Sequence, residues 1–333
     1  MSQRSHNKVV VTGGAGFIGS HLVDRLITLN PAATVVVVDN FSSGQQANIA
    51  RHLQESRLRL IEADVRDAAA VDESLAGAEV VYHLASQSQV ISDLREVNET
   101  FTTNVVGTVN VLRAAAKHAV KRVVFASSRE VYGEPITLPV DEDHPLLPIN
   151  SYGASVLAAE VYCRTLRRVF GLQTAILRLT NVYGPRDAGH VIPIWLERAA
   201  AGHDLLVYGG RQTLDFIWIG DAVEALITAG TSDAVNPPIN VASGTGIRAI
   251  DLARRIKRLT GCSGRIEVLP PRAFEVSRFV GNVSRMAQML NIQPQLDPLI
   301  HLPTMIEAAH RPGPHPQETR SPAVNGLLSP AAG

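Results

Sequence analysis

The sequence predicts an α/β fold: a Rossmann-type doubly wound parallel sheet that carries a smaller substrate-binding lobe. Three observations support this prediction. Apolar β-branched runs alternate with helical periodicity, a glycine-rich turn follows the first run, and an acidic residue ends the second. Strands buried on both faces form continuous apolar runs, and alternating strands and helices imply parallel pairing through right-handed crossovers. The 333 residues, 45% of them hydrophobic, suffice for about two domains with a sizeable core.

Five runs in the first half of the chain are short and rich in valine, leucine and isoleucine. They predict strands at residues 8–12, 34–38, 58–62, 79–84 and 122–126, and a sixth run predicts another at 174–179. Apolar residues at helical spacing predict helices at 17–29, 101–118 and 152–170. Prolines interrupt the sequence from Pro185 to about Pro303, so we assign this less regular region mainly to the smaller lobe.

The composition argues against several classes of protein. The 31 basic and 31 acidic residues cancel, so the net charge offers no attraction to nucleic acid or to an anionic membrane. No stretch reaches the roughly 18 apolar residues of a membrane-spanning helix. The two cysteines, Cys163 and Cys262, favour a reducing, cytoplasmic compartment. The 11 histidines lack metal-ligand spacing, and we therefore predict no metal site.

A glycine-rich turn lies between the first predicted strand and the first predicted helix. Gly13 permits a tight turn, Gly16 lets backbone amides approach a pyrophosphate, and Gly19 lets the helix pack on the strand. Asp39 ends the second strand, 20 residues beyond Gly19, where it can accept hydrogen bonds from a ribose and repel a 2′-phosphate. The pattern therefore predicts a dinucleotide site that prefers NAD to NADP.

Polar residues at the ends of the next two strands carry weaker predictions. Asp64 and Val65 follow the third strand, where the adenine amino group of a dinucleotide could be bound. A solvated acid at the end of a strand is an equally good interpretation of Asp64. His83 ends an apolar strand, and we interpret it as a structural histidine rather than a ligand.

Further motifs follow in order at residues 12–19, 39–40, 83–86, 104–108, 127–133, 152–155, 178–185 and 212–216. With them the chain resembles the extended short-chain dehydrogenases/reductases over about residues 8 to 308. It is most similar to the nucleotide-sugar epimerase/dehydratase branch, including UDP-glucose 4-epimerase-like and UDP-N-acetylglucosamine 5,6-dehydratase-like members. The resemblance implies tightly held NAD, a nucleoside-diphosphate sugar as substrate, and a homodimer formed through helices near 101–118 and 152–170.

The resemblance also divides the chain into functional parts. Residues 1–184 and 213–245 are expected to form the NAD-binding Rossmann domain, and residues 185–212 and 246–310 the nucleotide-sugar-binding lobe. Residues 311–333 contain several prolines and no periodic apolar face, so we expect a disordered tail there.

The resemblance implies a role for each residue that matches a family motif. Tyr152 is the expected catalytic base, and Ser128 is its hydroxyl partner beside the sugar O4. The expected cofactor contacts are Gly13, Gly16, Phe17, Ile18, Gly19, Asp39, Asn40, Asp64, Val65, Leu84, Ala85, Ser86, Asn104, Ser127 and Tyr152. The expected substrate contacts are Ser86, Ser128, Arg129, Asn181, Val191, Arg211, Gln212, Arg272 and Arg278. Alternatively, Asn181 caps a turn and Arg272 is a solvated loop charge.

One position departs sharply from the family pattern. Relatives have a lysine four residues after the tyrosine, one helical turn away, and here that residue is Val156. A phenol with an ordinary pKa near ~10 is a poor base at neutral pH unless a nearby cation stabilises its phenolate. Because valine supplies neither a charge nor a donor, we expect much-reduced turnover or an inactive form.

Glu130 is a second informative position. Sugar 4,6-dehydratases and some decarboxylases have a glutamate there, which in dehydratases removes the C5 proton once C4 is a ketone. The dehydratase pattern also has an aspartic acid where this chain has Arg129, and arginine cannot serve as a general acid because it stays protonated. The alternative interpretation of Arg129 and Glu130 is a surface ion pair.

Three functions are compatible with these residues. The leading hypothesis is an NAD-dependent nucleotide-sugar 4-epimerase, with a UDP-sugar as the expected substrate, that oxidises C4 transiently. The second is a UDP-sugar 4,6- or 5,6-dehydratase that uses Glu130 as the C5 base. The third, motivated by Val156, is a catalytically impaired protein that binds NAD and a UDP-sugar without turnover.

Overall fold

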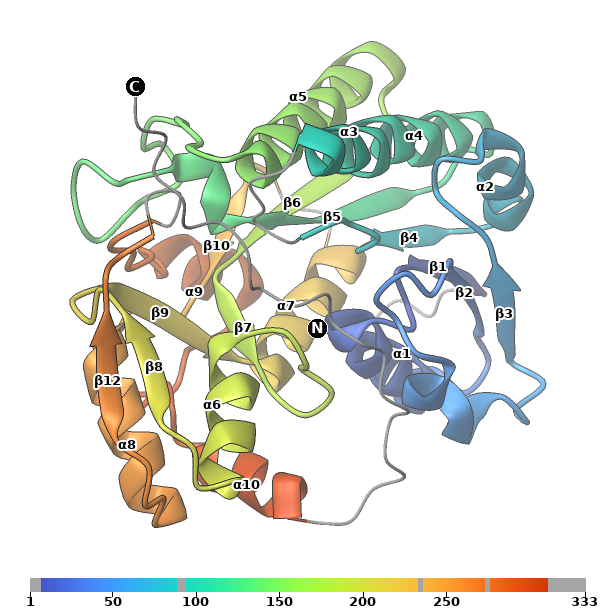
Figure 1. Ribbon diagram of the computed structural model, residues 1–333. Helices are drawn as coiled ribbons and strands as arrows, with labels where there is room; N and C mark the ends of the chain where they lie inside the picture. The colour runs from blue at the N-terminus through green and yellow to red at the C-terminus, as the bar shows by residue number, and fades with distance from the viewer. Residues whose placement is uncertain (1–6, 89–93, 233–235, 273–275, 311–333) are drawn as a thin grey trace.

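The computed structural model describes residues 7–88, 94–232, 236–272 and 276–310, and the predicted tail at 311–333 lies outside them. Its centre is a parallel sheet of seven strands in the order β10-β6-β5-β4-β1-β2-β3 (Figure 1). The strands are β1 Lys8–Thr12, β2 Thr34–Asp39, β3 Leu58–Glu62, β4 Val80–His83, β5 Arg122–Ser128, β6 Thr174–Leu179 and β10 Ile239–Val241. This arrangement confirms the predicted doubly wound α/β sheet.

The strands of this sheet are buried on both faces. In β1, Val9 and Val11 pack into the core on one side, whereas Val10 packs into the core on the other, because side chains alternate along a strand. The first side is covered by α1 Phe17–Leu29, α7 Ile219–Thr231 and α9 Ser284–Leu290. The other side is covered by α2 Ala68–Leu75, α4 Thr108–Lys117 and α5 Ser151–Phe170 (Figure 1).

One predicted helix contains a π-helical turn. The helix predicted at 101–118 is part of a longer helical stretch, which consists of α3 Leu94–Phe101, the π-helical turn η2 Thr102–Gly107 and α4. Asn104 lies in this turn, and its side chain makes hydrogen bonds to residues of other elements. The prediction of helix over this segment is therefore confirmed, and the π-helical turn within it is of a kind that is frequent at functional sites.

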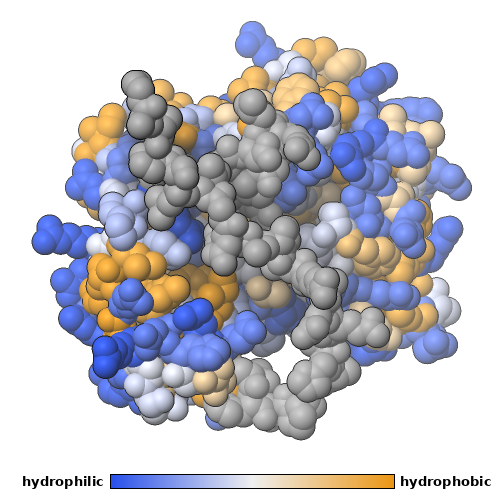
Figure 2. All heavy atoms as spheres, in the orientation of Figure 1, coloured by the Kyte–Doolittle hydropathy of each residue, from blue (hydrophilic) through white to orange (hydrophobic). Residues whose placement is uncertain are grey.

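The smaller lobe has its own apolar core. Its elements are α6 Val191–Ala200, β8 Leu205–Tyr208, α8 Ala249–Thr260, β12 Ile266–Leu269 and α10 Leu302–His310. Trp195 of α6 packs with Leu252 and Ile256 of α8 in this core. β8 and β12 pair in parallel, and Figure 2 shows apolar side chains gathered on the surface over these two strands.

A three-stranded sheet connects the lobe to the larger part of the molecule. It consists of β7 Asn181–Tyr183, β9 Thr213–Trp218 and β11 Gly246–Arg248, in the order β11-β9-β7. Along β9, Phe216 packs into the lobe core and Ile217 into the core beneath the seven-stranded sheet. Residues 181–183 and 213–218, which the sequence assigned to the NAD-binding domain, thus pair with residues 246–248 of the lobe or with each other.

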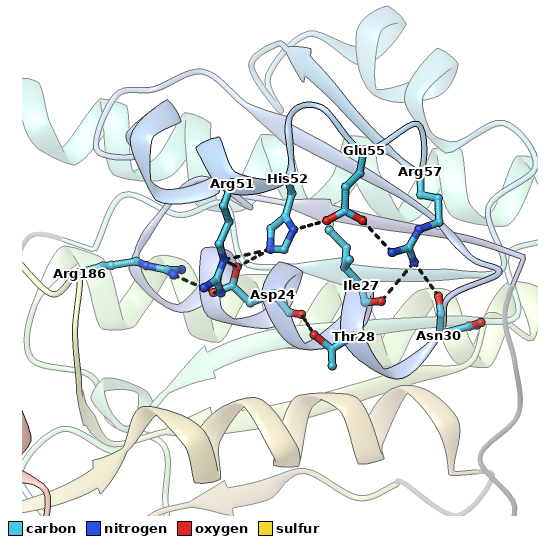
Figure 3. A network of polar contacts seen from close by, with 9 residues as sticks. All are labelled: Asp24, Ile27, Thr28, Asn30, Arg51, His52, Glu55, Arg57 and Arg186. Atoms are coloured by element: carbon cyan, nitrogen blue, oxygen red, sulfur yellow. Dashed lines mark hydrogen bonds and ion pairs between the residues drawn. The ribbon is translucent and has the colours of Figure 1, made fainter.

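A polar network fixes α1 to the segment that enters the lobe (Figure 3). Asp24 of α1 accepts hydrogen bonds from Arg51 and from His52 of η1 Gln46–His52, and from Arg186, whose Nη2 lies 2.7 Å from the carboxylate. Burial opposes ionisation of Asp24, but Arg51 and Arg186 outweigh it and lower the pKa of the carboxyl. His21 of α1 also contacts the carbonyl of Pro185 at 2.8 Å. The helix that follows the glycine-rich turn is thereby held against the start of the lobe.

Candidate active site

The glycine-rich turn is built closely against its neighbours. Gly13 has a φ of +70°, and a Cβ added there would lie 2.7 Å from the backbone nitrogen of Ala85. A Cβ on Gly19 would lie 2.1 Å from the carbonyl oxygen of Gly13. Gly16 is the N-cap of α1 and provides no side-chain cap, so the first N–H groups of the helix, including those of Phe17 and Ile18, face the space before it.

Asp39 ends β2 next to this turn and is 7% exposed. One carboxylate oxygen accepts the backbone N–H of Ala15 at 2.9 Å, and the other accepts that of Phe41 at 2.8 Å. Each oxygen has a second lone pair, so the carboxylate can also accept hydrogen bonds from ribose hydroxyls. Its position therefore suits the role predicted from its spacing.

Asn40 and Asp64 form a small polar cluster at the ends of neighbouring strands. The Asp64 carboxylate accepts hydrogen bonds from Nε and Nη2 of Arg66, at 2.9 and 2.7 Å, and from Nδ2 of Asn40 at 2.8 Å. The hydrogen bonds from Arg66 and Asn40 lower the pKa of Asp64 to about 2, against burial. Val65 is buried and lies against Gly107 of η2. Asp64 is thus an ionised strand-end acid with partners of its own.

Tyr152 lies in the first turn of α5, and its phenol makes hydrogen bonds with the hydroxyls of Ser128 and Ser86. Asn150 caps this helix by accepting the backbone N–H of Gly153 at 2.8 Å, which fixes the turn that carries the tyrosine. The structure therefore brings together three of the predicted site residues, from the ends of β4 and β5 and the start of α5.

The surroundings of the phenol disfavour its ionised form. Burial is the largest cause, and the carboxylate of Glu130 adds to it, so the pKa of Tyr152 is raised above its ordinary value. The hydrogen bonds from Ser128 and Ser86 and the charge of Arg129 act in the opposite direction without cancelling these effects.

Val156 provides no compensation. It lies one helical turn after Tyr152, is 2% exposed, and belongs to the apolar core that includes Phe125 and Cys163. The position that holds a lysine in relatives is therefore an apolar packing site in this chain.

Asn104 joins several of these elements. Its Oδ1 accepts hydrogen bonds from the Ser86 hydroxyl at 3.0 Å and from the Gln87 backbone N–H at 2.8 Å. Its Nδ2 donates to Ser155 Oγ at 2.9 Å, and Ser155 in turn donates to the carbonyl of Tyr152 at 2.7 Å. In this structure Asn104 thus holds Ser86 and the first turn of α5 in place.

A buried hydrogen-bonded row connects β1 with η2. The Thr108 hydroxyl lies 2.5 Å from the carbonyl oxygen of Asn104 and must donate to it, because a carbonyl cannot donate. Thr108 therefore accepts from Nε2–H of His83 at 2.9 Å, and His83 Nδ1 accepts from the Thr12 hydroxyl at 2.7 Å. His83 is a neutral, structural histidine, and burial lowers its pKa to about 4.

We expect acid to destabilise the protein through His83. Its pKa is about 4 in the folded chain and about 6.5 in the unfolded chain, so the unfolded state binds more protons between these values. The contribution of His83 to the free energy of unfolding is therefore fully present above about pH 6.5. It falls as the pH drops towards 4, by about 3 kcal/mol in total. Urea unfolding of the parent protein and of His83→Gln at pH 7 and 4.5 measures this loss. Equal losses in both proteins would contradict the assignment.

Ser127, the neighbour of Ser128, points into a different buried network. Its hydroxyl donates to Glu160 Oε1 at 2.5 Å, and Nε and Nη2 of Arg178 hold the same carboxylate at 2.9 and 2.8 Å. The proton of the Ser127 hydroxyl is thus engaged inside the protein, and the cofactor contact of Ser127 stays a prediction. No local pattern in the sequence indicated Glu160. Arg178 begins the motif at 178–185, but no role was predicted for it, and Asn150, two residues before Tyr152, was recognisable as a helix cap.

Arg129 and Glu130 form a buried ion pair rather than a surface pair. Nη2 of Arg129 lies 2.9 Å from Oε1 of Glu130, and the two side chains are 13% and 10% exposed. The other carboxylate oxygen accepts from Asn150 Nδ2 at 2.8 Å. Both oxygens of Glu130 therefore have partners close to Tyr152.

The predicted substrate contacts in the lobe are spread over several elements. Nδ2 of Asn181 donates to the carbonyl of Asp215 at 2.8 Å. The Arg272 guanidinium lies 3.8 Å from the ring centre of Tyr208. Its side chain is exposed in a loop, which fits the alternative of a solvated charge, and the contact with a substrate phosphate stays a prediction. Arg278 lies 3.8 Å from a carboxylate oxygen of Glu134 and is half exposed.

The remaining predicted lobe contacts differ in their exposure and partners. Arg211 is exposed, and Oε1 of Gln212 is buried without a hydrogen-bond partner in the described part of the chain. Val191 begins α6, and Leu214 packs against the lobe core. Gln212 is thus a polar group that a bound ligand could satisfy.

The described ranges offer neither a metal centre nor a membrane-spanning helix. They contain no group of three or more His, Cys, Asp or Glu residues suited to a metal ion. None of their helices combines the length and apolar character needed to cross a bilayer.

Comparison with known proteins identifies the family. The model of the NAD dependent epimerase/dehydratase family matches residues 9–242. The chain belongs to this family. A putative UDP-glucose 4-epimerase of Methanocaldococcus jannaschii is 36% identical over 297 residues, which cover 87% of this chain and 94% of that protein. UDP-glucuronic acid decarboxylase 1 of Arabidopsis thaliana is 32% identical over 312 residues, which cover 91% of this chain and 70% of that protein.

A solved relative has the same fold over nearly its whole length. The structure of a Thermotoga maritima UDP-glucose 4-epimerase with UDP-glucose superposes with a TM-score of 0.84 at 31% identity, covering 90% of this chain and 97% of that one. As a member of the epimerase/dehydratase family, the protein has NAD as its cofactor. The glycine-rich turn fits this dinucleotide, because Gly13 and Gly19 leave no room for side chains and the uncapped start of α1 offers N–H groups to an anion.

Proposed function

We propose that the protein is a UDP-sugar 4-epimerase that oxidises C4 of the sugar transiently, and that Val156 makes this oxidation slow. The observation that carries the proposal is the hydrogen bond between Tyr152 and Ser128, beside the glycine-rich turn. The epimerase relatives support the choice of a UDP-sugar.

In this proposal each residue has a defined task. Tyr152 accepts the proton of the C4 hydroxyl, while Ser128 and Ser86 hold the phenol in position. NAD, held by the glycine-rich turn and Asp39, supplies the acceptor for the hydride that leaves C4. Because burial and Glu130 raise the pKa of Tyr152, only a small fraction of the phenol is ionised at neutral pH.

Tyr152→Phe is expected to abolish interconversion of UDP-glucose and UDP-galactose, because phenylalanine cannot accept the C4 proton. The matched control is Tyr162→Phe, which alters an exposed tyrosine on the same helix and should retain the parent rate. Chromatography of the UDP-sugars after incubation measures the conversion. Turnover that survives Tyr152→Phe would refute this role, and mass spectrometry of a copurified ligand would identify the sugar.

Dehydration is the second candidate function, because the Glu130 carboxylate lies close enough to Tyr152 to raise the pKa of its phenol. In that reaction Glu130 removes the C5 proton, so C5 exchanges with deuterated water and the product loses water. Epimerisation conserves mass and requires no C5 exchange. Mass spectrometry in deuterated water distinguishes the two reactions, and Glu130→Gln should stop the exchange if Glu130 is the base.

The apolar burial of Val156 supports a third possibility, a protein that binds NAD and a UDP-sugar but does not turn over. Tight binding of UDP-glucose by calorimetry, with no product and no reduction of NAD, is the expected result in that case.

We also propose that the protein forms a homodimer through the helices around α4 and α5. Apolar side chains are exposed there: Phe101 by 53%, Val106 by 38%, Val161 by 48% and Tyr162 by 42%. Figure 2 shows apolar side chains at the upper edge of the molecule, where α5 lies. Light scattering is expected to give about twice the 35.8 kDa of the chain. Tyr162→Asp should give a monomer, whereas Val268→Asp on the lobe should not.

The cysteines support a location in the cytoplasm. Cys163 and Cys262 are both free and buried, which suits a reducing compartment, and cell fractionation tests this assignment.

A further inference from the structure

Arg129 has a nitrogen that the protein does not satisfy. Its Nη2 pairs with Glu130, but its Nη1 is buried and has no hydrogen-bond partner among the residues that the structure describes. A buried donor without a partner costs free energy, and such groups in native proteins usually bind a ligand or water. The side chain is only 13% exposed, so it is held in place rather than free in solvent.

The surroundings place this guanidinium at the reacting end of the site. Arg129 directly follows Ser128, whose hydroxyl contacts Tyr152, and its positive charge acts on the Tyr152 phenol. The guanidinium also lies 5.7 Å from the ring centre of Phe279, which limits its movement. Asn150 and Arg129 together hold the Glu130 carboxylate, so the geometry of the pair is fixed before any ligand binds.

We propose that Nη1 of Arg129 binds a carboxylate on the hexose, so that the preferred substrate is an acidic nucleotide sugar. This inference rests on the proposed function, in which Tyr152 contacts the C4 hydroxyl. A group beside Ser128 can then reach the substituents of the two carbons bonded to C4. These substituents are O3 on C3 and C6 on C5. Arginine forms a stronger, charge-assisted hydrogen bond with a carboxylate than with the neutral hydroxyl oxygen of an uncharged sugar. A carboxylate at either place would therefore be selected.

Calorimetry with matched ligands tests the proposal. One pair is UDP-glucuronic acid and UDP-glucose, which differ at C6, and the other is UDP-N-acetylmuramic acid and UDP-N-acetylglucosamine, which differ at O3. We expect the acidic member of one pair to bind at least tenfold more tightly than its neutral partner, and the pair that shows this preference locates the carboxylate.

Two variants assign the preference to Arg129. Arg129→Gln is expected to remove it while leaving the affinity for UDP unchanged. Because this change leaves Glu130 buried without its cation, the double variant Arg129→Gln with Glu130→Gln, which buries no charge, serves as the folding control. NAD binding verifies that each variant is folded.

The other outcomes overturn the proposal in distinguishable ways. Equal affinities within both pairs, or a preference that survives Arg129→Gln, would show that Arg129 does not bind a carboxylate of the sugar. Weaker binding of UDP itself in Arg129→Gln would mean that Nη1 contacts the diphosphate instead. Failure of the parent protein to bind UDP or any UDP-sugar would refute the proposed function itself, and this inference with it.

Discussion

Replacing Val156 with lysine is expected to accelerate oxidation of the sugar by orders of magnitude. Position 156 lies one turn after Tyr152 on α5, so a lysine ammonium there can approach the phenol. If it lowers the pKa of the phenol by about 3 units, the phenolate fraction near neutral pH rises roughly a thousandfold. Single-turnover reduction of bound NAD by UDP-sugars, followed at several pH values, measures the effect. The gain should be largest near neutral pH and diminish at high pH, where the parent phenol also ionises.

The matched control is Val156→Met, which has a long side chain but no charge. Val156 is 2% exposed in an apolar core, so lysine carries a desolvation cost that methionine does not. Thermal unfolding and NAD binding therefore accompany the rate measurement. A folded, NAD-loaded Val156→Lys protein that is no faster than Val156→Met with a verified substrate would mean that the site does not use a tyrosine–lysine mechanism.

Breaking the ion pair between Glu160 and Arg178 is expected to lower the free energy of unfolding by about 3–5 kcal/mol. The two side chains are 0% and 2% exposed, and the Arg178 guanidinium also bonds the Tyr132 hydroxyl at 2.9 Å and the Glu142 carbonyl at 3.0 Å. In Arg178→Met the Glu160 carboxylate remains buried and loses its buried cation, so that only the exposed Arg164 still contacts it.

Arg164→Met is the matched control for this pair. Arg164 contacts the same carboxylate at 3.3 Å but is 42% exposed, so its loss should change the free energy of unfolding by less than about 1 kcal/mol. The double variant Arg178→Met with Glu160→Gln should regain part of the loss. Urea unfolding measures all of these proteins, and equal effects of Arg164→Met and Arg178→Met would contradict the special importance of the buried pair.

Most of the sheet was predictable because its signal is local. The valine run that ends at Asp39 is continuous because β2 is covered on both faces. The glycine-rich turn lies between β1 and α1, as its sequence pattern predicts. The π-helical winding at η2 was not predictable. Asn104 in this turn bonds Gln87 and Ser155, and both of these partners lie far from it in the sequence. The three-residue strands β7 and β11 were missed because each depends on pairing with β9 rather than on its own pattern.

In the candidate site, too, some features were predictable from the sequence and others were not. Tyr152 and Ser128 are at the ends of regular elements, and the structure places their hydroxyls in contact. The burial of the Arg129–Glu130 pair was not predictable, because adjacent charges are usually solvated and here Asn150 and Phe279 enclose them. The Ser127 side chain likewise points toward Glu160, which lies on α5 33 positions later in the sequence, so its direction was not predictable from the motif.

The cover on one face of the large sheet has a consequence for how the chain folds as it is synthesised. Leu22 and Val23 of α1 share their core with Ala222 and Leu226 of α7, about 200 positions later in the sequence. While the ribosome is still making the first segment of the lobe, the early strands and α1 can already fold. That face of the sheet then still lacks α7. The nascent protein therefore exposes much of this apolar surface until α7 has emerged, and the rest of it until α9 follows. Chaperone binding to stalled chains should decline sharply once α7 is outside the exit tunnel.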